Sequence, residues 1–273
     1  TGFLNYLANI GQLNNKGVEF ELRTINFASP DFNWTSVLNL THNRNKIVTL
    51  DGDMTQSIEG SWFIHKIGLP YNSFYVKEFA GVDPMTGKAL YYLNTQDEQG
   101  IYSKEKTDDA SKAQAIPYKS ADPKISGGFT NIISYKWFDL GLTFTYSLGG
   151  YSFDKAGTMI ETDGSKEKSY NLPVYALDRW QKPGDITTMK DIRDRNVTTG
   201  ASSRFVQKNN TLQWSSLTMS YNFRPEQLKK LHLSGLRLSF TMNDLFYWST
   251  IRQERGLDYP YSRSFNLTTN IIF

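Results

Sequence analysis

The final residues of the chain alternate between apolar and polar side chains and finish on an aromatic residue. Phe265, Leu267, Thr269, Ile271 and Phe273 occupy one set of alternate positions, and polar residues fill most of the positions between them. Successive side chains of a β-strand point to opposite faces, so this segment predicts a strand with one apolar and one polar face. An amphipathic strand of this kind is typical of outer-membrane β-barrels.

The same alternation recurs along the chain at lengths that suit a membrane-crossing strand, which needs roughly 9–11 residues when tilted. The clearest case is Phe138–Leu148, where every second residue is aromatic or aliphatic. The other segments predicted as strands are Asn15–Phe27, Phe32–Lys46, Ile125–Tyr135, Leu212–Phe223, Leu236–Asn243 and Ser264–Phe273. The pattern predicts an all-β chain with about seven antiparallel strands.

The apolar faces of these strands identify the residues expected to contact lipid. In a membrane barrel the outer face is apolar and the inner face is polar, so the alternation separates the two sets. The residues predicted to face lipid are Phe138, Leu140, Leu142, Phe144, Leu217, Met219, Leu238, Phe240, Phe265 and Leu267.

The links between the strands alternate in length, and this predicts their orientation. Short links follow the first, third and fifth strands, whereas the segments of about 47–124, 149–211 and 244–263 are long. Bacterial barrels keep short turns in the periplasm and long loops outside the cell. The three long segments are therefore predicted to be extracellular loops.

Seven strands do not make a closed barrel. A single-chain bacterial barrel has an even number of strands, at least about eight, and an unpaired strand edge is not stable in lipid. Residues 1–273 are therefore predicted to form the C-terminal part of one larger transmembrane β-barrel. Thr1–Ile10 has neither the basic start nor the apolar run of a signal peptide.

Composition narrows the classes of protein. No apolar run approaches the roughly 18 residues of a membrane-spanning helix, so an α-helical membrane protein is excluded. Cysteine is absent, which excludes disulfides, thiolate nucleophiles and zinc–thiolate sites. A net charge of +3 with scattered basic residues gives no reason to expect a nucleic-acid partner.

Candidate catalytic and metal-binding motifs are weak. Gly81–Ala89 has the wrong glycine spacing for a phosphate-binding loop, and a turn built on its Asp-Pro and Thr-Gly pairs is the preferred interpretation. Asp51–Asp53 and Asn94–Gly100 offer oxygen ligands but lack the spacing of a calcium loop, so solvated turns are preferred. The three histidines, His42, His65 and His232, lie far apart. No enzyme activity, cofactor or metal is predicted.

Several motifs resemble those of the SusC/RagA-type TonB-linked outer-membrane proteins of Bacteroidota. Asn9–Glu19 resembles the family's entry into a barrel strand, Phe79–Gly87 its "AG-x-D-P-x-TG" loop, and Pro123–Asn131 its "P-K-x-x-G-G-x-x-N" strand start. Further similarities follow in order along the chain at Asp178–Trp180, Arg204–Val206, Asn243–Phe246 and Tyr259–Ser264.

This resemblance implies a barrel of about twenty-two strands with an N-terminal plug. The plug and the TonB-binding segment are not in these residues, so TonB would act through the missing N-terminal part. The resemblance also implies a SusD-like surface lipoprotein that covers the outer loops as a lid. Phe273, with Ile271, is assigned to recognition by the barrel-assembly machinery, and a simple lipid anchor is the alternative.

The predicted function is therefore the barrel wall and outer loops of an outer-membrane importer for a glycan or a peptide-like nutrient. One alternative is a structural or assembly role for the same barrel in an envelope complex. The other is a soluble β-sandwich that binds carbohydrate, in which the apolar faces would pack together and exposed aromatic residues would stack on sugars. The aromatic residues considered for that role are Trp62, Tyr75, Tyr91 and Tyr92.

Overall fold

The computed structural model describes residues 11–251 and 262–273, apart from 61, 162, 164–170 and 196. The chain divides into two compact units. We call one of them the wall unit; it contains Lys16–Arg44, Pro123–Gly150 and Asn209–Phe273. We call the other the loop unit; it contains Thr1–Asn15, Asn45–Asp122 and Tyr151–Lys208.

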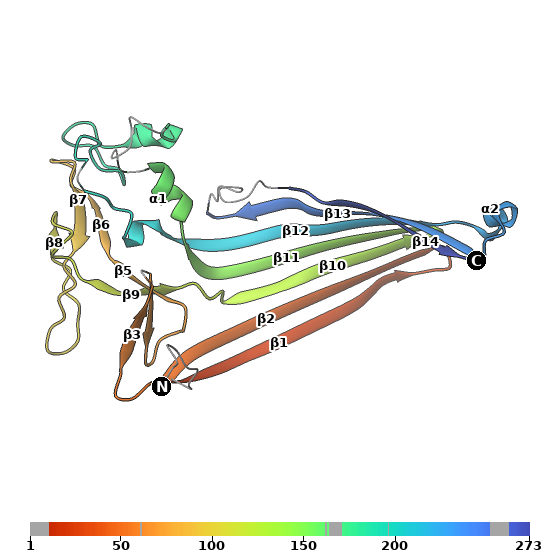
Figure 1. Ribbon diagram of the computed structural model, residues 1–273, viewed down its shortest axis with the longest axis horizontal. Coiled ribbons are helices and arrows are strands. Elements are labelled where there is room, and N and C mark those ends of the chain that lie inside the picture. The colour runs from red at the N-terminus through yellow and green to blue at the C-terminus, as the bar shows by residue number, and fades with distance from the viewer. Residues whose placement is uncertain (1–10, 61, 162, 164–170, 196, 252–261) are drawn as a thin grey trace, which may run out of the picture. The chain divides into compact units, whose positions relative to one another are not determined.

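The main sheet has seven antiparallel strands, as the alternation predicted (Figure 1). Their spatial order follows their order in the chain. The strands are β1 (Gly11–Ala28), β2 (Phe32–Leu50), β10 (Ile125–Tyr135), β11 (Phe138–Phe153), β12 (Val206–Asn222), β13 (Gly235–Ser249) and β14 (Phe265–Ile272).

Several of these strands are longer than a membrane crossing requires. β1, β2, β11 and β12 contain 18, 19, 16 and 17 residues, whereas a tilted crossing needs roughly 9–11. β2, β11 and β12 extend beyond their predicted limits at the ends that join the long links, and β1 begins four residues earlier than predicted. β11, for example, continues to Phe153 through Gly149, whose φ is +84°.

Short links join β1 to β2, β10 to β11 and β12 to β13, as predicted. The last of these contains α2 (Pro225–Leu228) and η4 (Lys229–Leu231), and α2 lies at the same end of the sheet as the C-terminus (Figure 1). None of the helices in the described part of the chain combines the length and the hydropathy needed to cross a membrane.

The register of the sheet places residues of like character opposite one another. Phe240 of β13 lies opposite Met219 of β12 and also opposite Leu267 of β14. Directly opposite residues of antiparallel strands share a face, so these three side chains lie on one surface. On the other surface hydroxyl groups pair across strands, as in Ser220 with Ser239 at 2.9 Å.

A glycine is required at one point of the sheet because a tyrosine crosses it. Gly127 lies opposite Tyr146, whose hydroxyl donates a 2.8 Å hydrogen bond to the carbonyl oxygen of Asn39. A Cβ atom at Gly127 would lie 2.1 Å from that carbonyl oxygen and 2.6 Å from the tyrosine hydroxyl oxygen. The tyrosine ring therefore covers the glycine and ties β11 to β2 across β10.

The loop unit contains two smaller sheets. The first is built from β3 (Gln56–Glu59), β4 (Phe63–Lys66), β5 (Ser73–Lys77) and β9 (Ala115–Ser120), and the second from β6 (Phe79–Val82), β7 (Ala89–Tyr92) and β8 (Lys106–Thr107). Three short helices, α1 (Lys155–Glu161), η2 (Val174–Asp178) and η3 (Ser203–Phe205), complete the described part of the unit.

Two small hydrophobic clusters stabilise the loop unit. Phe74, Val76 and Val206 form the first, with Trp62 and Phe153 among the side chains packed against it. Ala89, Tyr91 and Ala113 form the second. Tyr91 is fully buried, so the expectation that it is an exposed platform for a sugar is wrong. An aromatic residue in a short strand fits a surface or a core equally well in sequence, and only packing distinguishes them.

Candidate functional site

The first candidate site is the apolar face of the main sheet. The ten residues predicted to face lipid lie on β11, β12, β13 and β14, and none of them is fully buried. Phe138, Met219, Phe265 and Leu267 are exposed, and the others are partly covered by cross-strand neighbours. An exposed surface of this extent is unusual for a protein face in contact with water. Contact with lipid remains a prediction from this pattern.

A polar cluster interrupts the apolar face, and alternation alone did not reveal it. Asn131 of β10 lies opposite Leu142, on the predicted lipid side, and is almost completely buried. Its Oδ1 accepts hydrogen bonds from the Trp34 indole nitrogen at 2.9 Å and from the Ser36 hydroxyl at 2.8 Å. The Asn26 side-chain amide donates to that hydroxyl at 2.6 Å. Because these groups satisfy one another, an apolar surrounding can tolerate them.

The opposite face of the sheet is polar and is organised around one carboxylate. Asp139 of β11 accepts hydrogen bonds from Ser134 at 2.8 Å and from the Asn222 amide at 3.0 Å. It also pairs with Arg237 of β13 at 3.2 Å. A single side chain thus connects β10, β11, β12 and β13, which is the kind of network expected on a wetted inner surface.

Arginine substitutions in β11 test the assignment of the two faces. Leu142→Arg should destabilise the full-length protein by about 2–4 kcal/mol if the residue lies near the bilayer midplane, because the charge would enter hydrocarbon. Thr143→Arg points to the polar face and should have a smaller effect. Urea unfolding in lipid vesicles measures both, and equal losses at the two positions would contradict the assignment.

The second candidate site is the turn at Asp83–Lys88 in the loop unit, within the segment predicted to form a turn and not a phosphate-binding loop. The Asp83 carboxylate accepts hydrogen bonds from the Met85 amide at 2.8 Å and from the Thr86 hydroxyl at 2.9 Å. The Gly87 amide donates to the Asp83 carbonyl at 2.8 Å. The Met85 and Thr86 donors lower the pKa of Asp83 below its ordinary value. The turn interpretation is confirmed.

This turn packs against Trp180, which lies far away in the sequence. The Trp180 indole nitrogen donates to the Pro84 carbonyl at 2.8 Å, and the Asp191 amide donates to the Gly87 carbonyl at 2.8 Å. A Cβ atom at Gly87, whose φ is +72°, would lie 2.5 Å from two carbon atoms of the Trp180 ring. We call this contact between the Asp83–Lys88 turn and the Trp180 segment the tryptophan clasp.

The clasp carries three carboxylates whose pKa values lie below the ordinary value of 3.8. They belong to Asp83, to Asp185, which accepts from the Gln181 and Lys182 amides, and to Asp191, which pairs with Arg193. A pKa that is lower in the folded than in the unfolded protein stabilises the fold above the unfolded value. That stabilisation is lost as the pH falls through the folded value.

The clasp should therefore open in acid and stay closed near neutral pH. We expect the fluorescence of Trp180, taken as the difference between the native protein and Trp180→Phe, to change below pH 3.8. Between about pH 5 and 8 it should be constant, because the three carboxylates stay ionised there. A transition centred near neutral pH would contradict this assignment of the titrating groups.

A cluster of buried charges lies elsewhere in the loop unit. The Arg204 side chain is 8% exposed and pairs with Glu161 at the end of α1 and with Asp163. The Asp163 carboxylate also accepts hydrogen bonds from the Thr199 amide at 2.6 Å and from its hydroxyl. Burial raises the pKa of Glu161 in spite of Arg204. This cluster fixes the end of α1 against Thr199 and η3.

A buried lysine adds a second cation to this region. The Lys190 ammonium donates to the carbonyl oxygens of Asp163 at 3.2 Å, Asp191 at 3.4 Å and Asp194. Burial lowers the pKa of Lys190, because the charged ammonium loses its hydration. These three carbonyl oxygens therefore surround the Lys190 ammonium, which fills the position that a bound cation would otherwise take.

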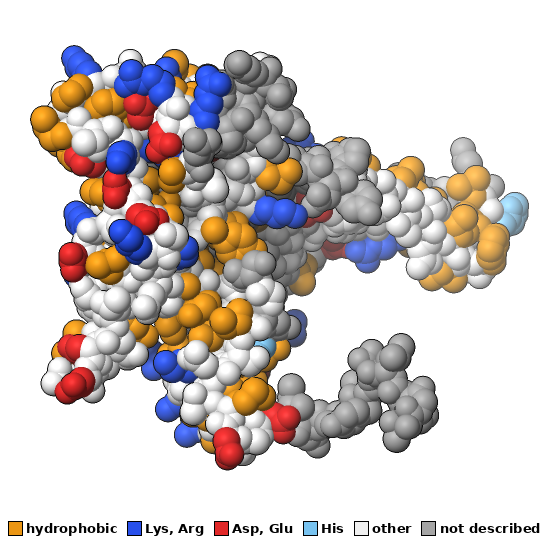
Figure 2. Space-filling model, turned by 60° about the vertical axis from the view of Figure 1, so that its left-hand side comes forward, with side chains coloured by type: hydrophobic (Ala, Val, Ile, Leu, Met, Phe, Trp, Pro, Cys, Tyr) orange, Lys and Arg blue, Asp and Glu red, His pale blue; other side chains and the backbone are white. Residues whose placement is uncertain are grey.

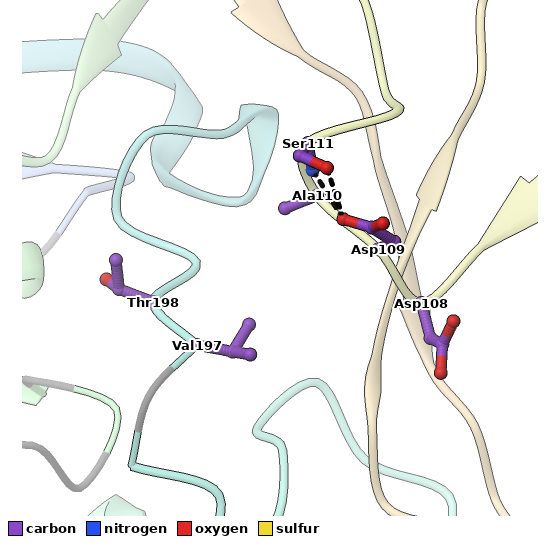
Figure 3. Close-up of a pocket in the computed structure, with 6 residues that line it drawn as sticks. All are labelled: Asp108, Asp109, Ala110, Ser111, Val197 and Thr198. Carbon is purple, nitrogen blue, oxygen red and sulfur yellow. Dashed lines mark hydrogen bonds between the residues drawn. The ribbon is translucent and has the colours of Figure 1, made fainter.

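The loop unit also contains an open pocket of about 440 Å³ (Figure 3). Asp108, Asp109, Ala110 and Ser111 line one side, and Val197 and Thr198 line the other. The Asp109 carboxylate accepts hydrogen bonds from the amide and hydroxyl of Ser111, and these bonds lower its pKa. Asp108 is paired with Lys88 at 2.6 Å. Both carboxylates already have partners, so the pocket alone does not identify a ligand.

The remaining motifs do not form a site. The Asp97 carboxylate accepts from the Gln99 and Ile101 amides, which confirms a turn at Asn94–Gly100. His42 lies on β2, His65 stacks on Tyr71, and His232 lies between β12 and β13. Within the described residues no group of His, Cys, Asp and Glu could hold a metal ion. Asn9 and Ile10 of the first motif, and Tyr259 to Tyr261 of the last, lie outside the described residues.

Comparison with curated proteins identifies relatives over most of the chain, although no family model matches it. The chain is 27% identical over 273 residues to TonB-dependent receptor P3 of Formosa agariphila, covering 95% of this chain and 26% of the relative. It is 28% identical over 157 residues to TonB-dependent receptor SusC of Bacteroides thetaiotaomicron, covering 53% of this chain and 15% of SusC. The chain thus spans about a quarter of the length of the first of these relatives.

Comparison with solved structures identifies the same fold. The structure of the RagAB peptide transporter matches with a TM-score of 0.81 and 23% identity, covering 99% of this chain and 30% of the matched one. The RagAB peptide importer in its 'closed-closed' state gives 0.79, 23% identity and coverages of 96% and 30%. Its 'open-open' state gives 0.77, 22% identity and coverages of 96% and 29%.

These findings confirm the resemblance to the SusC/RagA-type TonB-linked outer-membrane proteins. The antiparallel barrel fold class and the outer-membrane location are confirmed with it. The relatives are receptors and transporters, which agrees with the prediction that the chain is not an enzyme. The extent of the outer loops and the roles of individual residues remain predictions.

Proposed function

Because the chain is similar over most of its length to TonB-dependent receptors of the SusC/RagA type, we propose that it forms part of an outer-membrane importer. In this proposal it supplies barrel wall and outer loops for the active uptake of a glycan or a peptide-like nutrient. The observation that carries the proposal is the match of nearly the whole chain to the fold of a peptide transporter. The two-faced sheet is consistent with it.

The wall unit would separate lipid from a wet interior. Its apolar face, with Phe240, Met219 and Leu267 side by side, suits hydrocarbon, and the Asp139 network suits water or a plug. β1 and β14 lie at the two edges of the sheet. Since an open edge in lipid is costly, we propose that both edges pair with strands in the rest of the protein, giving a barrel of about twenty-two strands.

Partners follow from the same proposal. TonB would deliver energy through a plug in the rest of the protein, as the names of the relatives support. A SusD-like surface lipoprotein would close over the long links as a lid. Phe273 is 88% exposed at the end of the sheet, and we propose that, with Ile271, it is recognised by the barrel-assembly machinery during insertion.

Uptake measurements test the proposal. Cells that carry the full-length receptor are given a fluorescently labelled oligopeptide or a labelled oligosaccharide, and the cell-associated label is measured with and without an uncoupler of the proton gradient. We expect accumulation of one probe class, lost after uncoupling and after deletion of the partner lipoprotein. If neither probe showed energy-dependent uptake, the result would instead favour the structural or assembly role.

A further inference from the structure

Five aromatic side chains form a continuous row across one end of the apolar face of the main sheet. This is the end at which short links join β1 to β2, β10 to β11 and β12 to β13. Figure 2 shows hydrophobic side chains reaching the surface at this end of the sheet. We call the five residues the aromatic row; they are Phe32, Tyr135, Phe138, Tyr221 and Phe223.

Register and ring contacts connect each member of the row to the next. Tyr135 lies directly opposite Phe32 on β2 and directly opposite Phe138 on β11, so these three side chains share one face. The ring centroids of Phe138 and Tyr221 are 4.7 Å apart. Those of Tyr221 and Phe223 are 4.9 Å apart. The row therefore forms one surface that crosses β2, β10, β11 and β12 and ends just beyond β12.

Two exposed cations lie beside the row. The Lys136 Nζ atom is 5.5 Å from the centre of the Tyr135 ring, and the Arg224 guanidinium carbon is 6.0 Å from the centre of the Trp137 ring. The Asn222 amide donates to the Trp137 carbonyl at 2.8 Å, which holds the two short links together. Within the described residues neither cation forms an ion pair. Both charges can therefore bind an anion outside the chain.

The backbone of Lys136 has a conformation that favours glycine. Its φ is +52°, where a side chain is sterically disfavoured. The link between the paired residues Tyr135 and Phe138 has only two residues, and two-residue hairpin links favour glycine or asparagine at positive φ. A lysine in a position where glycine would be less strained indicates that its side chain is used.

The row lies at the depth expected of a membrane–water interface. Towards the other end of the same face, Trp214 stacks on Phe144 with ring centroids 5.5 Å apart, and Trp248 lies opposite Leu212. From Tyr221 to Leu212, β12 covers roughly 20–25 Å along the membrane normal at a barrel tilt of about 40°. The apolar band of a membrane barrel is about 25 Å tall and has aromatic residues at both margins.

The rest of the proposed barrel would leave the row uncovered. Further strands would pair with β1 and β14, at the edges of the sheet, whereas β10, β11 and β12 already have neighbours on both sides. A plug would lie on the polar face. Because the short links are predicted to be periplasmic, the row would meet the periplasmic leaflet of the membrane.

We infer that the aromatic row, together with Lys136 and Arg224, binds an anionic phospholipid of the periplasmic leaflet. This inference rests on the proposed function, because it requires the apolar face to contact lipid. The rings would contact the upper acyl chains and the glycerol, as aromatic residues do at the headgroup level. The two cations would bind the headgroup phosphate, for which the arginine fork offers paired donors.

Native mass spectrometry tests the inference. The full-length receptor in detergent is titrated with dioleoylphosphatidylglycerol or with dioleoylphosphatidylcholine, which has the same chains but no net charge. Lys136→Gln and Arg224→Gln should each weaken binding of the first phosphatidylglycerol about fivefold, the typical contribution of one basic residue at an anionic lipid surface. Binding of phosphatidylcholine should be nearly unchanged.

Two further variants serve as matched controls. Arg23→Gln removes an exposed cation of β1 that alternates with Leu22 and so points to the polar face; it should leave phosphatidylglycerol binding unchanged. Arg224→Lys keeps the charge and should retain most of the affinity. All variants are compared after the heat-modifiable gel mobility of a folded barrel has been verified.

The outcomes separate this inference from the proposed function. Selective loss of phosphatidylglycerol binding in the two glutamine variants, with both controls retained, supports it. Unchanged binding in the combined Lys136→Gln and Arg224→Gln variant overturns it, as does equal weakening for both lipids or by Arg23→Gln. Those results leave the importer intact. A native receptor without the heat-modifiable mobility of a barrel would contradict the proposed function itself.

Discussion

Replacing Arg204 with methionine is expected to destabilise the loop unit by about 3–5 kcal/mol, because it leaves two buried carboxylates without their cation. The side chains of Glu161 and Asp163 are only 11% and 5% exposed, so water cannot replace the guanidinium. The Thr199 amide, which donates to Asp163, should then exchange its hydrogen much faster. Hydrogen exchange followed by mass spectrometry on the full-length receptor measures this.

Two control variants test whether the unpaired buried carboxylates cause the destabilisation by Arg204→Met. Adding Glu161→Gln and Asp163→Asn to Arg204→Met removes the unpaired charges and should recover part of the stability. Arg193→Met removes an arginine whose side chain is 73% exposed and paired with Asp191, so it should change little. If Arg204→Met and Arg193→Met gave the same small effect, the buried cluster would not be holding α1 in place.

Replacing Trp180 with alanine is expected to cost about 3–5 kcal/mol in the stability of the loop unit, as for other buried aromatic residues. The ring fills the space above Gly87, and its nitrogen donates to the Pro84 carbonyl. Trp180→Phe keeps an aromatic ring but loses that hydrogen bond and part of the buried ring volume, so it should cost less than Trp180→Ala. Thermal unfolding of the loop unit, monitored by hydrogen exchange, distinguishes the two variants.

Gly87, which faces the Trp180 ring, gives a second test of the same contact. Gly87→Ala adds a Cβ atom 2.5 Å from the Trp180 ring at a φ of +72°, so it combines a collision with backbone strain. Gly81→Ala is the matched control, because its φ is +102° and nothing lies within 4 Å of its Cβ position. The alanine at position 87 should be the more destabilising of the two. The reverse order would show that the clasp is loose.

The strands of the main sheet could be predicted from the sequence, because apolar and polar residues alternate along a strand whose two faces meet different environments. A slip of one residue in β11 would exchange Leu142 and Thr143 between the two faces, so this pattern also restricts the register that the strand can adopt. Asn131 could not be anticipated in this way. Its position on the apolar face depends on hydrogen bonds with Trp34 and Ser36, residues nearly a hundred positions away in the chain.

The loop unit was less predictable because its contacts are not periodic. Gly87 and Trp180 each belong to a motif quoted from the sequence, but nothing in either motif indicates that they meet. Arg204 was similarly visible only as part of a motif. Its role as the counter-ion of Glu161 and Asp163 depends on tertiary contacts. The fold was therefore largely predictable, whereas the clasp and the charge cluster were not.

The central claim is that the apolar face of the main sheet contacts lipid, and a cysteine scan of β11 tests it most directly. The chain has no cysteine, so single spin labels can be placed at positions 139 to 144 of the full-length receptor in lipid vesicles. We predict that labels at 140, 142 and 144 are reached mainly by lipid-soluble oxygen, and those at 139, 141 and 143 mainly by a water-soluble nickel reagent. Accessibility without this period of two, or with the two sets exchanged, would contradict the claim.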